Sequence, residues 1–116
     1  MTPKLYPSLR FADSDAALRF LQDAFGFTEH AVHRGGDGAI RHAELALGDD
    51  MIMFGQGDPA QHGIYIAVDD LDAQYERAKA AGAEITRELA DTDYGSREFA
   101  ARDLDGHEWY FGTYRP

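Results

Sequence analysis

Two polar residues in the middle of the chain, His42 and Glu44, have the types and spacing that metal binding or proton transfer requires. They lie two positions apart where apolar and polar residues alternate, so both side chains project from one face of an expected strand. Glu108, in a second alternating stretch, could join them from another strand, because imidazole nitrogens and carboxylate oxygens bind divalent metals. An exposed sheet face that simply carries polar residues explains the same pattern.

The same pair could also act as a general base, with Glu44 orienting His42. Side chains at positions i and i+2 lie about 7 Å apart along a strand, which argues against direct contact. The other histidines are interpreted as loop, turn or surface residues: His30, His33, His62 and His107. The sequence therefore assigns no catalytic residue.

Periodicity and turn chemistry predict the elements that must hold these residues. Alternating apolar residues predict strands at residues 5–11, 28–34, 39–47, 51–55, 63–68 and 84–89. One helix is expected to begin at Asp13 or Ser14 and to end at Gly26, and a second to begin at Asp70 and end at Gly82. The chain thus alternates between single helices and groups of strands.

Residues 91–112 predict a closing hairpin, since alternating residues flank a cluster of turn formers. Its last strand has Trp109 and Phe111 on the side expected to join a core. Glu108 and Tyr110 lie on the other side, where they can line a site.

The order of elements repeats at an offset of 57 residues, which aligns Phe54 with Phe111. We therefore predict that residues 1–116 form one domain of two modules, residues 5–56 and 62–114, joined by a linker at residues 57–61. The offset also sets His42 opposite Phe99, although the first should face away from the core and the second into it. One module should contain a one-residue slip or bulge.

The composition limits the kinds of partner and the cellular compartment that we expect. The chain has 21 Asp and Glu against 11 Lys and Arg, a net charge of -10 that repels the phosphate backbone of nucleic acids. The same field attracts cationic small molecules, although many domains are acidic for solubility alone. Without cysteine, an export signal or an apolar stretch of about 18 residues, the chain is predicted to be cytoplasmic, with no membrane partner.

Four segments carry a resemblance to a known family: Phe25-Gly26-Phe27, residues 64–72 (IYIAVDDLD), residues 94–97 (YGSR) and residues 103–107 (DLDGH). In them the chain resembles the vicinal oxygen chelate superfamily of glyoxalase I, fosfomycin resistance proteins, extradiol dioxygenases and bleomycin resistance proteins. The resemblance implies an α+β fold of two strand-helix-strand-strand-strand modules. Their curved sheets are expected to form a cup that is commonly completed across a homodimer.

Metal-dependent members of this family place ligands on the first and fourth strands of each module. Those positions fall here on Tyr6, Met53, Gly63 and Tyr110. Phenols, a thioether and a glycine are poor ligands for zinc, nickel or magnesium. The resemblance therefore predicts no metal and no cofactor here.

Aromatic residues give a different expectation for the cup. Tyr6, Tyr65 and Tyr110 would face it, with Met51 and Met53 beside them as a wall for flat or cationic organic ligands. Alternatively, the tyrosines fill the space of a lost metal or pack at the dimer contact.

Arg97 is expected either to anchor an acidic group or to pair with a nearby carboxylate. The expected ligand-binding residues are Tyr6, His42, Glu44, Met53, Tyr65, Arg97, Glu108 and Tyr110. The preferred function is metal-free sequestration of a small organic ligand such as an antibiotic. Two alternatives stay open: a glyoxalase-like lyase, isomerase or dioxygenase with a nonstandard metal site, and a carrier or interaction module with a vestigial cup.

Overall fold

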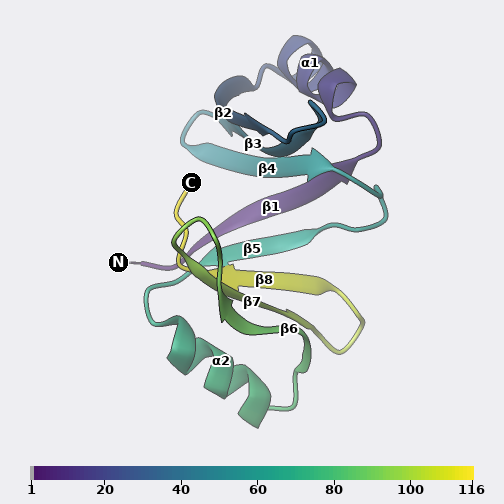
Figure 1. Ribbon diagram of the computed structural model, residues 1–116. Helices are drawn as coiled ribbons and strands as arrows, with labels where there is room; N and C mark the ends of the chain where they lie inside the picture. The colour runs from purple at the N-terminus through teal and green to yellow at the C-terminus, as the bar shows by residue number, and fades with distance from the viewer. Residues whose placement is uncertain (1) are drawn as a thin grey trace. The chain divides into compact units, whose positions relative to one another are not determined.

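The computed structural model describes residues 2–116. Contacts divide them into two compact units, which we call module one (Tyr6–His62) and module two (residues 2–5 and Gly63–Pro116). A strand, a helix and three further strands follow one another twice along the chain (Figure 1). Neither helix among the described residues is long and apolar enough to cross a membrane.

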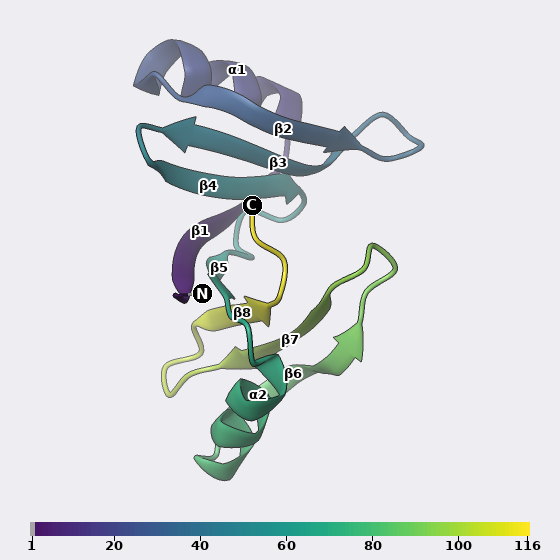
Figure 2. The ribbon, with the colours of Figure 1, turned by 90° about the vertical axis from the view of Figure 1, so that its left-hand side faces the viewer.

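Module one is a four-stranded sheet with one helix. Its elements are β1 (Lys4–Phe11), α1 (Ser14–Phe25), β2 (Thr28–Arg34), β3 (Ile40–Leu47) and β4 (Asp50–Gln56). The strand order is β2-β3-β4-β1, with β1 and β4 parallel and the other pairs antiparallel. The helix α1 covers one face (Figure 2), and Leu21 packs there against the buried Ile40, Ala43, Leu45 and Phe54.

Alternate residues of these strands point away from α1, because successive side chains of a strand project to opposite faces. We call this surface the helix-free face of module one. It carries Tyr6, Ser8 and Arg10 from β1, Glu44 and Ala46 from β3, and Met51, Met53 and Gly55 from β4.

Module two has the same organisation. Its elements are β5 (Gly63–Ala67), α2 (Leu71–Ala80), β6 (Glu84–Asp91), β7 (Arg97–Arg102) and β8 (Glu108–Gly112), in the order β5-β8-β7-β6. In its core the ring of Phe99 stacks on Phe111 at 4.7 Å and meets Tyr75 edge-on at 5.1 Å. The helix-free face of module two carries Tyr65, Tyr110 and their alternate neighbours Gly63, Glu108 and Gly112.

The expected slip between the modules lies in a turn. Phe54 and Phe111 are 57 residues apart, but their strand partners Ala43 and Phe99 are 56 apart. The β3–β4 turn closes at the pair Leu47 and Asp50, whereas the β7–β8 turn spans residues 103–107 and is one residue longer. The structural counterpart of Phe99 is therefore Ala43 and not His42.

Both expected helix starts are confirmed. The carboxylate of Asp13 accepts a hydrogen bond from the backbone N–H of Ala16, and that of Asp70 accepts one from Ala73, each at 3.1 Å. Asp13 is thus the cap residue of α1, and Ser14 is the first helical residue. The six strands predicted from alternation begin and end within two residues of the observed ones.

Candidate functional site

The polar centre of the helix-free face of module one is Glu44, whose residue surface is 1% exposed. It lies between Ala31 of β2 and Met53 of β4 in the sheet register. Nε2 of His42 donates to its Oε2 at 2.7 Å, and Nε2 of His30 lies 3.7 Å from its Oε1. A carboxylate removed from water requires such partners, so the two imidazoles account for its burial here.

The expectation that His42 and Glu44 lie too far apart for contact is wrong. The spacing of about 7 Å applies to the backbone of a strand. Both side chains are long enough to bend toward each other, and their polar atoms meet. Because an ionised carboxylate can only accept, the bond to it requires a proton on Nε2 of His42.

His30 and His33 are exposed residues of β2, in agreement with the expectation that they lie at the surface. His30 faces Glu44, and the ring of His33 stacks on His42 with 6.1 Å between centroids. Residues three apart cannot share a face of a regular strand, but the pairing with β3 shifts between Glu29 and Ala31. Sequence reasoning missed His30 because this bulge leaves no local signal.

On the helix-free face of module two, two tyrosine rings cover two glycines. Cε2 of Tyr110 lies 2.8 Å from the position that a Cβ of Gly63 would take, and the carbonyl oxygen of Glu108 lies there too. The hydroxyl oxygen of Tyr65 lies 2.6 Å from the corresponding position at Gly112. The rings therefore occupy space that side chains at these two positions would need.

The phenol of Tyr65 is held by the C-terminal segment. Its hydroxyl donates to the carbonyl oxygen of Tyr114 at 2.5 Å. Burial raises the pKa of Tyr65, and the negative charge of Glu98 raises it further. Tyr65 therefore presents a neutral, fixed ring.

Arg97 lies on the helix side of the module-two sheet. Its guanidinium contacts Asp91 at 2.9 Å and Asp72 of α2 at 3.3 Å, which corresponds to the second of its two expected roles. The same parity that puts Phe99 into the core turns Arg97 toward α2. We therefore leave Arg97 out of the binding surface proposed below.

Glu108 is engaged within module two. Its Oε1 accepts a hydrogen bond from Nε of Arg102 at 2.7 Å, and Arg102 also pairs with Glu84 at 3.0 Å. These bonds raise the pKa of Arg102, the Glu108 bond most strongly. The carboxylate of Glu108 is thus part of a charged row across three strands.

The side chains at the family's ligand positions do not fit a divalent metal. Tyr6, Met53 and Tyr110 offer phenols and a thioether, and the space above Gly63 is filled by the ring of Tyr110. Within residues 2–116, no three His, Asp or Glu side chains converge in an arrangement that could hold a metal ion. We derive no step that uses a metal at these positions.

Comparison with known proteins gives a match over most of the chain. The model of the Glyoxalase/Bleomycin resistance protein/Dioxygenase superfamily matches residues 5–111. An uncharacterised protein from Mycobacterium tuberculosis is 30% identical over 125 residues, which cover 95% of this chain and 74% of that protein.

Solved structures agree in fold. A superfamily member from Vibrio splendidus has a TM-score of 0.77 at 21% identity, covering 96% of this chain and 98% of its own. Methylmalonyl-CoA epimerase from Mycobacterium tuberculosis has a TM-score of 0.73 at 21% identity, covering 96% and 87%. The predicted α+β fold class is thereby confirmed. The chain belongs to the Glyoxalase/Bleomycin resistance protein/Dioxygenase superfamily.

Proposed function

We propose that the protein binds a small organic molecule and leaves it chemically unchanged. The helix-free face of each module offers contacts of its own, at Tyr6 and Met53 in module one and at Tyr65 and Tyr110 in module two. The observation that carries the proposal is the packing of the Tyr110 ring over Gly63. An aromatic ring therefore covers the position at which the family's metal-dependent members have a metal-binding side chain.

The chemistry of these side chains favours an apolar or aromatic ligand body. Ligand sites are mostly apolar with a few polar anchors, and thioethers adapt to irregular shapes. The net charge of -10 favours ligands that carry a positive group. The family's name includes bleomycin resistance proteins, which supports sequestration of an antibiotic-like compound.

The test is a titration with a panel of flat cationic aromatic compounds. Trp109 neighbours Tyr110 in β8 and is the only tryptophan, so its fluorescence reports binding. We expect saturable quenching, with mass spectrometry recovering the compound unaltered. The absence of saturable quenching across the panel, or a modified compound, would contradict sequestration.

Two variants of one position separate ring contact from other effects. Tyr110→Leu should weaken binding about fivefold, since an aromatic contact contributes about 1 kcal/mol beyond its buried area. Tyr110→Phe keeps the ring and should bind as the native protein does. Equal affinity of the leucine variant would remove Tyr110 from the binding surface.

The bond between His42 and Glu44 favours a second candidate, an enzyme that moves a proton. A carboxylate bound to the imidazole of His42 orients it as a general base that could take a proton from a carbon next to a carbonyl group. Ketones, 2-oxo acids and thioesters incubated with the protein in D₂O would then gain deuterium at that carbon. His42→Gln should abolish the exchange, and no exchange with the native protein would reject this candidate.

A further inference from the structure

A cavity of about 430 Å³ lies at one end of the module-one sheet, apart from the residues discussed above. It is lined by the β2–β3 loop, the start of β3 and the end of β4: Gly35, Gly36, Asp37, Ala39, Ile40, Arg41 and Gln56. Two of the lining residues, Arg41 and Gln56, have side chains that can donate hydrogen bonds. We ask what these two groups can bind.

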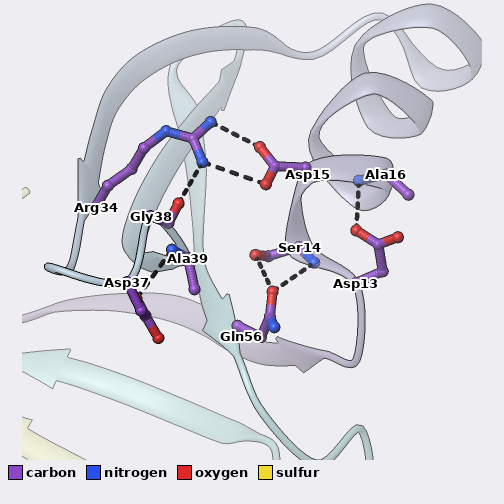
Figure 3. A network of polar contacts seen from close by, with 9 residues as sticks. All are labelled: Asp13, Ser14, Asp15, Ala16, Arg34, Asp37, Gly38, Ala39 and Gln56. Atoms are coloured by element: carbon purple, nitrogen blue, oxygen red, sulfur yellow. Dashed lines mark hydrogen bonds and ion pairs between the residues drawn. The ribbon is translucent and has the colours of Figure 1, made fainter.

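The amide of Gln56 is held in one orientation. Its Oε1 accepts both the backbone N–H of Ser14 at 3.3 Å and the hydroxyl of Ser14 at 2.8 Å (Figure 3). Two donors on one oxygen identify that atom as the carbonyl, so the NH₂ group faces away from Ser14. Figure 3 shows this nitrogen on the side opposite the helix start.

Arg41 has no carboxylate partner within residues 2–116, in a chain with 21 acidic residues. Its Cδ lies 2.8 Å from the position that a Cβ of Gly35 would take, so its stem rests on this glycine.

The loop that forms the other wall is braced. Arg34 donates to both carboxylate oxygens of Asp15 in α1, at 2.6 and 3.2 Å, and to the carbonyl oxygen of Gly38 at 2.9 Å (Figure 3). The carboxylate of Asp37 also lines the cavity and accepts the backbone N–H of Ala39 at 3.0 Å. The wall is therefore preorganised, and its one acid already has a donor.

We propose that this cavity is a binding site for a small anion, a phosphate or carboxylate group, held by Arg41 and the NH₂ of Gln56. A planar guanidinium forms paired, charge-assisted hydrogen bonds to such groups. The site is independent of the proposed aromatic ligand. An anion can bind here whether or not the helix-free faces bind an organic molecule.

The test is calorimetric titration of the full chain with inorganic phosphate and, separately, with acetate. Tighter binding of phosphate assigns the site to phosphate groups, and tighter binding of acetate assigns it to carboxylates. Gln56→Glu keeps the acceptor for Ser14 but replaces the donors by a negative charge, so affinity should fall at least about tenfold. Arg41→Gln should cause a similar loss.

Arg19→Gln is the matched control, because Arg19 is an exposed arginine on α1 of the same module without an ion pair. It should retain the native affinity. No binding of either anion to the native protein would overturn the proposal. An equal loss of affinity in Arg19→Gln, or native affinity in Gln56→Glu, would also overturn the proposal. Binding would then depend on the overall charge of the protein and not on this cavity.

Discussion

At the scale of single residues, the carboxylate of Asp103 accepts several hydrogen bonds that the alternation of apolar and polar residues does not predict. Its carboxylate accepts the indole N–H of Trp109 at 3.0 Å and the backbone N–H groups of Asp105 and His107 at 3.0 and 2.9 Å. The Trp109 bond is the largest of the causes that lower the pKa of Asp103 to about 2. Trp109, expected to belong to the core, is thus half-buried and tied to the turn.

This pKa predicts a dependence of stability on pH. A carboxylate whose pKa is lower in the folded state stabilises the fold above its unfolded pKa near 3.8, and the contribution is lost as pH falls toward about 2. Asp103→Asn should lower the unfolding temperature at neutral pH and flatten its decline between about pH 4 and pH 2. Thermal unfolding followed by Trp109 fluorescence measures both, and parallel curves for the two proteins would contradict the assignment.

At the scale of elements, β5 and β8 pack too closely at Gly63 to admit a side chain. A methyl group there would meet the carbonyl oxygen of Glu108 and the ring of Tyr110. Gly63→Ala should therefore lower the free energy of unfolding by about 1–3 kcal/mol. Gly36→Ala is the control, because nothing lies within 4 Å of its added carbon. Urea unfolding of both variants decides, and equal stabilities would mean that β5 yields to the methyl group without cost.

The elements were predictable where their causes are local. Asp13 and Asp70 cap helices through bonds to residues three positions on, so short sequence windows contain the signal. The bulge at His30 and the longer β7–β8 turn depend on pairing with another strand. A one-residue mismatch was therefore foreseeable, but its location was not.

The candidate site was predictable to the same degree. Alternation places Glu44 on the helix-free face, and the His42 contact depends on side-chain conformations that alternation does not encode. Arg97 had two expected roles, and only the position of α2 supplies Asp72 as a partner. The motifs identified the family, because they contain the turn residues and helix caps of the whole fold.

At the scale of the whole molecule, the homodimer expected from the family stays a prediction. Phe20 and Phe25 of α1 are 57% and 59% exposed, and their rings meet edge-on at 5.2 Å. Burying an exposed aromatic pair under a second copy of the chain lowers the free energy of the system. We expect light scattering after size-exclusion chromatography to give the mass of two chains.

Phe20→Asp should shift that mass toward one chain, since the charge would have to be buried in the dimer. Leu104→Asp changes a fully exposed turn residue and should leave the mass unaltered. A native protein with the mass of one chain would reject the dimer.

The covering of Gly63 by Tyr110 has a consequence for how such a protein could change over time. A histidine or glutamate cannot enter at position 63 by a single substitution, because the ring and the Glu108 carbonyl oxygen block it. Residue 110 would have to shrink first, and that intermediate would have lost its aromatic surface without yet gaining a chelating group. The order of substitutions is therefore constrained, since position 110 has to change before position 63 can.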